Sequence, residues 1–160
     1  MAEDQAQTAA QEEAQTEAST AVMTVEDCIG QLQQLRAVVM PMLEACHDEY
    51  QSRCRPSYPY VVDNIERGGV FGITLDPGFG AYFMTDGQDV YGEIHRVALR
   101  TDTLSAANYE KFSGRPVQER VELDLTGDPG TLWVRQCRNI ISRLLNYWTQ
   151  QQTNLFRVDS

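Results

Sequence analysis

Apolar residues recur at helical spacing near the start of the chain. Thr24 and Asp27 have the spacing of a capping box, with Asp in place of the usual Glu, so a helix is expected to begin at Val25. Stepping the residues at about 100° each predicts an amphipathic helix that reaches about Arg53. Its apolar arc consists of Val25, Cys28, Ile29, Leu32, Leu35, Val39, Leu43, Cys46, Tyr50 and Cys54.

The middle of the chain alternates short apolar runs with turn-forming residues. Gly68-Gly69, Asp76-Pro77-Gly78 and Asp86-Gly87 favour turns, and the runs between them favour antiparallel strands. The expected strands cover residues 59–65, 70–75, 81–85 and 90–100.

Side chains on these strands sort into two unlike faces. If the loops cover 76–80 and 86–89, Leu75 pairs with Ala81 and Thr85 pairs with Val90. The face expected to form the core receives Phe71, Ile73, Leu75, Ala81, Phe83, Val90 and Ile94. The other face receives Val70, Thr74, Tyr82, Met84, Tyr91, Glu93 and His95.

The last third of the chain predicts further elements. Residues 101–114 favour a short helix, and the alternation in VQERVELDL, residues 117–125, predicts a half-buried strand. Asp128-Pro129 is a helix start that opens a helix through about Gln150, and residues 155–158 permit a final strand. The apolar arc of the long helix holds Trp133, Val134, Cys137, Ile140, Ile141, Leu144, Leu145, Tyr147 and Trp148.

Together these elements predict an α+β fold. Residues 23–160 are expected to form a single domain, an antiparallel β-meander of about four to six strands packed against two long amphipathic helices, N-terminal and C-terminal. Residues 1–22 have no aromatic residue and predict a disordered acidic tail rich in Ala, Gln and Glu. The order of elements and the acidity resemble those of small acidic secretion chaperones.

Charge narrows the classes of partner. Twenty-three acidic and thirteen basic residues give a net charge of −10, opposite to that of proteins that bind nucleic acid or anionic membranes. The predicted tail holds five of those acids, which leaves eighteen acidic against thirteen basic residues elsewhere. No secretion signal or apolar run of about 20 residues is present, so a cytoplasmic protein with reduced thiols is expected.

One sheet face combines tyrosines, a methionine, a carboxylate and an imidazole, which are side chains that binding surfaces use. The candidate binding face is Thr74, Tyr82, Met84, Tyr91, Glu93 and His95. It favours a non-enzymatic interaction protein, chaperone-like or adaptor-like, that binds a protein or peptide or forms a homodimer. The alternatives are a half-covered sheet face without a partner, and a small-molecule sensor or small enzyme with a pocket around His95, Glu93, Tyr82 and Tyr91.

The sequence assigns no catalytic residue, cofactor or metal site. Cys46 and Cys54 lie eight helical residues apart, about 12 Å along the axis, which is too far to share a zinc ion. Cys54 is a candidate reactive thiol because Arg53 and Arg55 flank it and cations stabilise a thiolate. The alternative is an unreactive cysteine near the carboxyl end of a helix, where the helix dipole disfavours a thiolate.

Overall fold

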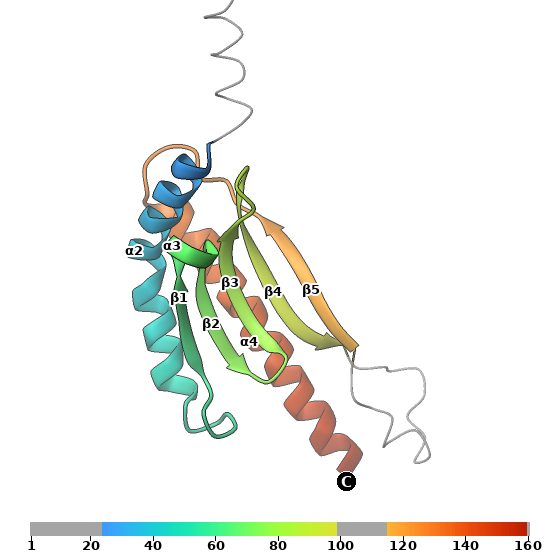
Figure 1. The fold of residues 1–160 in the computed structure, drawn as a ribbon. Helices are drawn as coiled ribbons and strands as arrows, with labels where there is room; N and C mark the ends of the chain where they lie inside the picture. Colours follow the sequence, from blue (N-terminus) through green and yellow to red (C-terminus); the bar gives the residue numbers. More distant parts are fainter. Residues whose placement is uncertain (1–23, 99–114, 160) are drawn as a thin grey trace, which may run out of the picture.

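The computed structural model describes residues 24–98 and 115–159, which form a five-stranded antiparallel sheet with two long helices on one of its faces (Figure 1). The strands lie side by side in chain order, so the sheet is a meander. This arrangement confirms the predicted α+β fold. Its elements are α2 (Val25–Tyr50), β1 (Tyr60–Asn64), α3 (Ile65–Gly68), β2 (Val70–Asp76), β3 (Phe79–Thr85), β4 (Val90–Ala98), β5 (Arg115–Glu122) and α4 (Thr131–Asp159).

Helix α2 begins at the predicted capping box. The Thr24 hydroxyl oxygen accepts a hydrogen bond from the Asp27 amide at 3.1 Å, and the Asp27 carboxylate accepts one from the Thr24 amide at 3.3 Å. The helix ends at Tyr50, before the predicted Arg53, because Arg53 and Cys54 both donate their backbone N–H to the Tyr50 carbonyl and so close a turn.

Helix α4 starts later and runs further than predicted. The Val134 amide donates to the Gly130 carbonyl at 3.0 Å, which places the first helical residue at Thr131 rather than at Pro129. The predicted strand at 155–158 is wrong because α4 continues to Asp159. Nothing between residues 150 and 159 is a glycine or proline that would end the helix.

The hydrophobic core lies between the helices and the sheet. Every residue assigned to the core face from the two-residue period is buried, and the Phe71 and Phe83 rings stack there at 5.2 Å between centroids. Both apolar helix arcs reach this face, α2 mainly over β2 and α4 mainly over β4. A Cβ at Gly92 would lie 2.7 Å from the Ile140 Cδ1 atom, so this glycine lets α4 approach the sheet closely.

The β2–β3 register differs from the prediction, although the two faces do not. Ala81 pairs with Ile73 rather than with Leu75, because the turn contains only Pro77 and Gly78 and a β-bulge interrupts β2 beside it. Gly78 has a φ of 84°, a left-handed backbone conformation that glycine adopts more readily than other residues. The faces are as predicted because residues 73 and 75 lie on the same side of the strand. The predicted pairing of Thr85 with Val90 is confirmed.

Other differences are local. The run expected at 59–65 forms β1 and then the short helix α3, which Gly69 ends with φ 61°. Strand β5 begins at Arg115 and ends at Glu122, two residues earlier at its start and three earlier at its end than the predicted strand. The tail at 1–22 and the helix at 101–114 lie outside the described residues.

A matched pair of glycine substitutions tests the close approach of β2 and β3. A Cβ at Gly72 would lie 2.2 Å from the Ala81 carbonyl oxygen and 2.7 Å from the Tyr82 Cα, and these backbone atoms cannot move aside freely. Gly72→Ala is expected to lower the free energy of unfolding by about 2 kcal/mol or more. Gly30→Ala, in α2 with nothing within 4 Å, is expected to raise it by about 0.5–1 kcal/mol.

Urea unfolding followed by circular dichroism measures both changes. If Gly72→Ala unfolds at the same urea concentration as the unsubstituted protein, the close approach described for these strands is wrong.

Candidate functional site

The face of the sheet opposite the helices contains the predicted binding residues. We call it the open face, and alternate residues of all five strands form it (Figure 1). Its members are Tyr60, Val62, Asn64, Val70, Gly72, Thr74, Gly80, Tyr82, Met84, Tyr91, Glu93, His95, Val97, Pro116, Gln118, Arg120 and Glu122. The six candidate binding residues are all half-buried on this face, so the structure brings them together. Whether they bind a partner stays a prediction.

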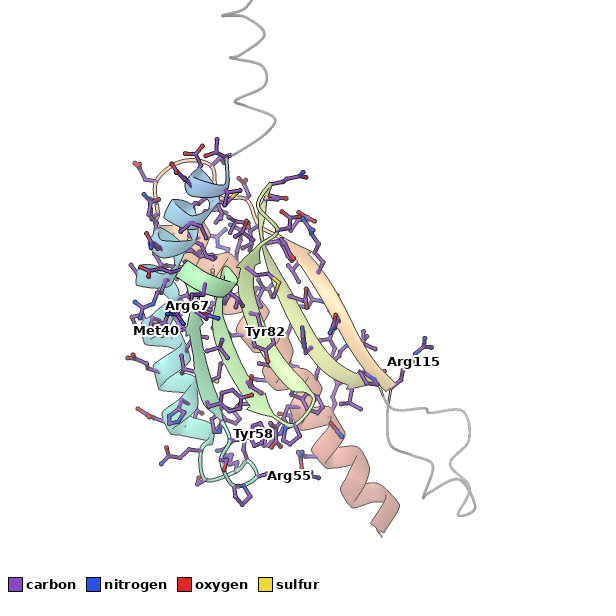
Figure 2. The ribbon with its side chains drawn as sticks, in the orientation of Figure 1. Met40, Arg55, Tyr58, Arg67, Tyr82 and Arg115 are labelled. Carbon is purple, nitrogen blue, oxygen red and sulfur yellow. The ribbon has the colours of Figure 1, made fainter. Side chains whose placement is uncertain are left out.

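Tyr82 lies near the middle of the open face (Figure 2). Its hydroxyl group and that of Thr74 form a hydrogen bond at 2.7 Å, across β2 and β3. The ring rests on Gly72 and Gly80: a Cβ at Gly80 would lie 2.3 Å from the Tyr82 hydroxyl oxygen, and one at Gly72 would lie 3.0 Å from ring atom Cδ1. The two glycines therefore make the space in which the ring lies flat on the sheet. Burial raises the pKa of Tyr82, so its hydroxyl stays protonated at neutral pH.

His95 and Glu93 form a pair beside this ring. The His95 Nε2 donates to the Glu93 carboxylate at 2.5 Å, because a carboxylate can only accept. The imidazole also packs in a T-shaped arrangement with the Tyr82 ring, with 4.7 Å between the ring centroids. These two contacts fix the orientation of the imidazole. The Glu93 side chain that bonds to it is 18% exposed.

Two further tyrosines extend the aromatic surface. Tyr58 and Tyr60 have ring centroids 5.4 Å apart, and Tyr60 pairs with Thr74 across β1 and β2. Tyr60 lies near Tyr82 because its cross-strand partner Thr74 is hydrogen-bonded to the Tyr82 hydroxyl, and both tyrosines contribute to the raised pKa of Tyr82. We call Tyr58, Tyr60, Tyr82 and His95 the aromatic row. The alternation of Tyr58, Tyr60 and Val62 is a sequence signal that points to this extension. The prediction did not use it, because no register was set between 59–65 and 70–75.

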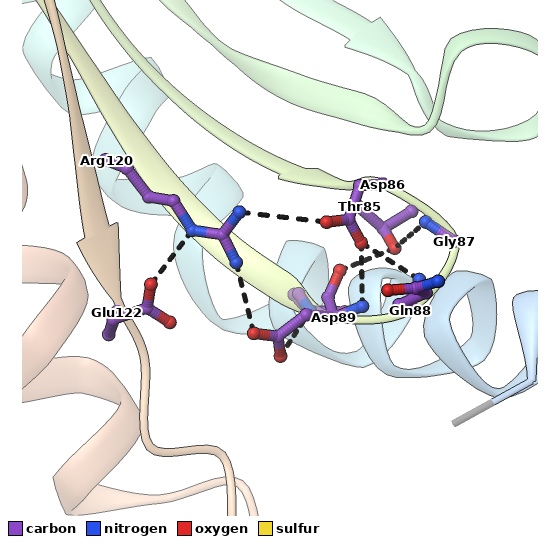
Figure 3. Close-up of polar contacts among 8 residues, drawn as sticks. Thr85, Asp86, Gly87, Gln88, Asp89, Arg120 and Glu122 are labelled. Carbon is purple, nitrogen blue, oxygen red and sulfur yellow. Dashed lines mark hydrogen bonds and ion pairs between the residues drawn. The ribbon is translucent and has the colours of Figure 1, made fainter. Parts of the chain in front are cut away.

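The β3–β4 end of the open face is acidic. The Arg120 guanidinium lies 3.8 Å above the centre of the Tyr91 ring, which is a cation–π contact. Three carboxylates surround this guanidinium, those of Glu122 at 2.9 Å, Asp89 at 3.2 Å and Asp86 at 3.7 Å (Figure 3). The Asp86 carboxylate also accepts from the amides of the β3–β4 turn. These four residues, the Arg120 cluster, carry two more negative charges than positive ones.

Cys54 lies just beyond α2, half-buried in the lining of a small cavity. Burial, and then the negative charge of Asp76, raise the pKa of the Cys54 thiol to about 11. One flanking cation, the Arg53 guanidinium, lies over the Tyr50 ring at 5.1 Å. A thiol with this pKa is almost entirely protonated at neutral pH. The reactive-thiol hypothesis stays a prediction, and the surroundings of Cys54 oppose it.

These features define an α+β protein in which the long helices of the described residues lie on one side of a β-meander and leave its other side uncovered. Comparisons with protein families, with curated proteins and with solved structures find no match for the chain. Among the described helices, none has the length and apolar character needed to cross a membrane. Nor do three or more His, Cys, Asp or Glu side chains of residues 24–98 and 115–152 gather where they could hold a metal ion.

Alkylation measures the state of Cys54 directly. The rate of its reaction with iodoacetamide is expected to rise about tenfold per pH unit and to be still rising at about pH 10, because only the thiolate reacts. Mass spectrometry distinguishes Cys54 from the other three cysteines, which are buried and act as internal controls. A rate that levels off at or below about pH 8.5, the ordinary thiol pKa, would contradict the raised pKa.

Proposed function

We propose that this protein is a non-enzymatic, cytoplasmic interaction protein whose open face binds an extended segment of a partner protein. The partner segment carries proline or aliphatic side chains together with at least one arginine or lysine. The observation that carries this proposal is the aromatic row, a set of rings fixed by internal contacts on a sheet face that no described helix covers.

The aromatic row supports the apolar part of this specificity. Tyrosine rings supply contact area with few rotatable bonds, and extended proline-containing segments dock on such aromatic surfaces with little loss of entropy. Tyr60 is 46% exposed, so its ring is accessible to a partner. The hydrogen bond of Tyr82 to Thr74 and the contact of its ring with His95 hold the row in place before binding.

Charge supports the basic part of the specificity. Glu93 and the carboxylates of the Arg120 cluster make four negative charges against the one guanidinium of Arg120. A basic segment would find complementary charge there, which raises association rates and selects against acidic partners. The same surplus argues against a second copy as the occupant, since a twofold interface would bring like charges together.

Selection from a random peptide library displayed on phage, with the full chain immobilised, tests the class of partner. Enriched sequences are expected to combine proline or aliphatic residues with arginine or lysine. Absence of enrichment, or enrichment of acidic sequences, would refute the proposal. A concentration-dependent dimer in sedimentation would instead favour self-association, and a small-molecule ligand displaced by Tyr82→Ala would favour the sensor or enzyme alternative.

Substitutions in the aromatic row are expected to weaken the selected peptides. Tyr82→Ala and Tyr60→Ala should each reduce affinity at least tenfold, because each removes a ring that fills the contact. Leu132→Ala is the matched control, since Leu132 is 41% exposed but lies on α4. Fluorescence anisotropy gives the affinities, and circular dichroism shows whether each variant is folded. Equal losses in Leu132→Ala and Tyr60→Ala would be incompatible with binding on the open face.

Neutralising one carboxylate tests the charge argument separately. Glu122→Gln removes the negative charge of a side chain that is 71% exposed and whose bond to Arg120 lies at the surface. We expect affinity to fall about two- to fivefold, mostly through slower association, and the loss to shrink in high salt. Stopped-flow fluorescence at two salt concentrations separates the rates. A tighter complex in Glu122→Gln would show that the partner is not basic.

A further inference from the structure

A small cavity lies at the end of the sheet away from the Arg120 cluster. The segment after α2, the end of β2, the start of β3 and the part of α4 around Gln151 line this partly open cavity of about 180 Å³. Its lining includes Arg53, Cys54, Arg55, Asp76, Phe79 and Gln151. Figure 2 shows Arg55 at this end of the molecule, between Tyr58 and the lower part of α4.

Asp76 is the charged group of this cavity that is withdrawn from water. It is only 7% exposed, because the bulge in β2 buries Leu75 and Asp76 in succession. Its carboxylate accepts hydrogen bonds from the Trp148 indole N–H at 2.9 Å and from the Arg55 amide at 3.2 Å. A carboxylate offers about four acceptor positions, so the two bonds leave further acceptor capacity at the cavity.

A second acceptor in the lining has no protein partner. The Oε1 atom of Gln151 is buried and makes no hydrogen bond in the structure. Leaving a buried carbonyl oxygen unpaired is unfavourable, and a donor brought by a ligand would remove that penalty. The cavity therefore presents two acceptors, the carboxylate of Asp76 and the amide oxygen of Gln151, to whatever fills it.

Cationic residues line the same cavity. Arg53 and Arg55 contribute two positive charges against the single negative charge of Asp76, which leaves the lining one charge positive. The Arg55 backbone is fixed by its bond to Asp76, and the Arg53 guanidinium lies over the Tyr50 ring. A carboxylate is the group that paired arginines recognise with the most favourable geometry.

We propose that this cavity binds a small carboxylic acid that also carries an amino or hydroxyl donor, a molecule of amino-acid size. The carboxylate of the ligand would pair with Arg55 or Arg53, and its N–H or O–H groups would donate to Asp76 and Gln151. The volume equals that of about six waters, which matches a ligand of roughly six to ten non-hydrogen atoms. An inorganic anion without O–H groups, such as sulfate, fits less well because it brings no donors for the two acceptors.

Isothermal titration of the full chain with the standard amino acids, lactate and malate tests the site. At least one compound is expected to bind with a dissociation constant in the millimolar range or tighter. Acetate, which lacks the donor, and ethylamine, which lacks the carboxylate, are expected to bind at least tenfold more weakly. Tight binding only among amino acids or only among hydroxy acids identifies the donor. If no compound binds, or if acetate binds equally well, the proposal is overturned.

Two variants locate the binding. Arg55→Ala removes the guanidinium but keeps the amide that holds Asp76, and Gln151→Leu removes the unpaired oxygen. Each is expected to weaken binding at least tenfold, whereas Arg67→Ala, an exposed arginine of α3, should leave it unchanged. Thermal unfolding verifies that each variant folds. Unchanged affinity in both cavity variants would overturn the proposal. Whether these variants weaken small-molecule binding or leave it unchanged, the result does not bear on peptide binding by the open face.

Discussion

Placement of both long helices on one face of the sheet is the constraint on which the other features depend. The apolar arcs of α2 and α4 bury Phe71, Phe83 and Ile94, and each square ångström of apolar surface removed from water contributes about 25 cal/mol. Gly92 lets α4 approach, since a Cβ there would meet Ile140 at 2.7 Å. Because this side of the sheet takes both long helices, the open face is stabilised, within the described residues, by its own side chains.

Side chains that lie flat on the sheet provide that stabilisation. The Tyr82 ring covers Gly72 and Gly80, and the Arg120 guanidinium covers the Tyr91 ring. Each ring thereby loses part of its exposure and its freedom to rotate, although none of the described helices lies above it. A face organised in this way gives up little conformational entropy when a partner binds, which is why a half-buried tyrosine surface suits recognition.

The local pattern of the sequence determined most of this fold but not its long-range pairings. The two-residue period assigned both sheet faces correctly even though Leu75 was paired with Ala81, because an error of two residues preserves the side on which each side chain lies. The extension of the aromatic row to Tyr58 and Tyr60 depends on the register between β1 and β2, which the local pattern of residues does not determine. Asp76 was assigned to a turn, and its burial depends on Trp148, 72 residues further along the chain.

Arg120 shows how the open face accommodates a cation. Its guanidinium stacks on an aromatic ring while carboxylates at the edge of the ring accept its N–H groups. The middle of the face has the same two components, the Tyr82 ring and the Glu93 carboxylate, directly opposite each other across β3 and β4. There the His95 imidazole bonds to Glu93 and packs in a T-shaped arrangement with the Tyr82 ring. Under the proposed function, an arginine of the partner would make with Tyr82 and Glu93 the contacts that Arg120 makes with Tyr91 and Glu122.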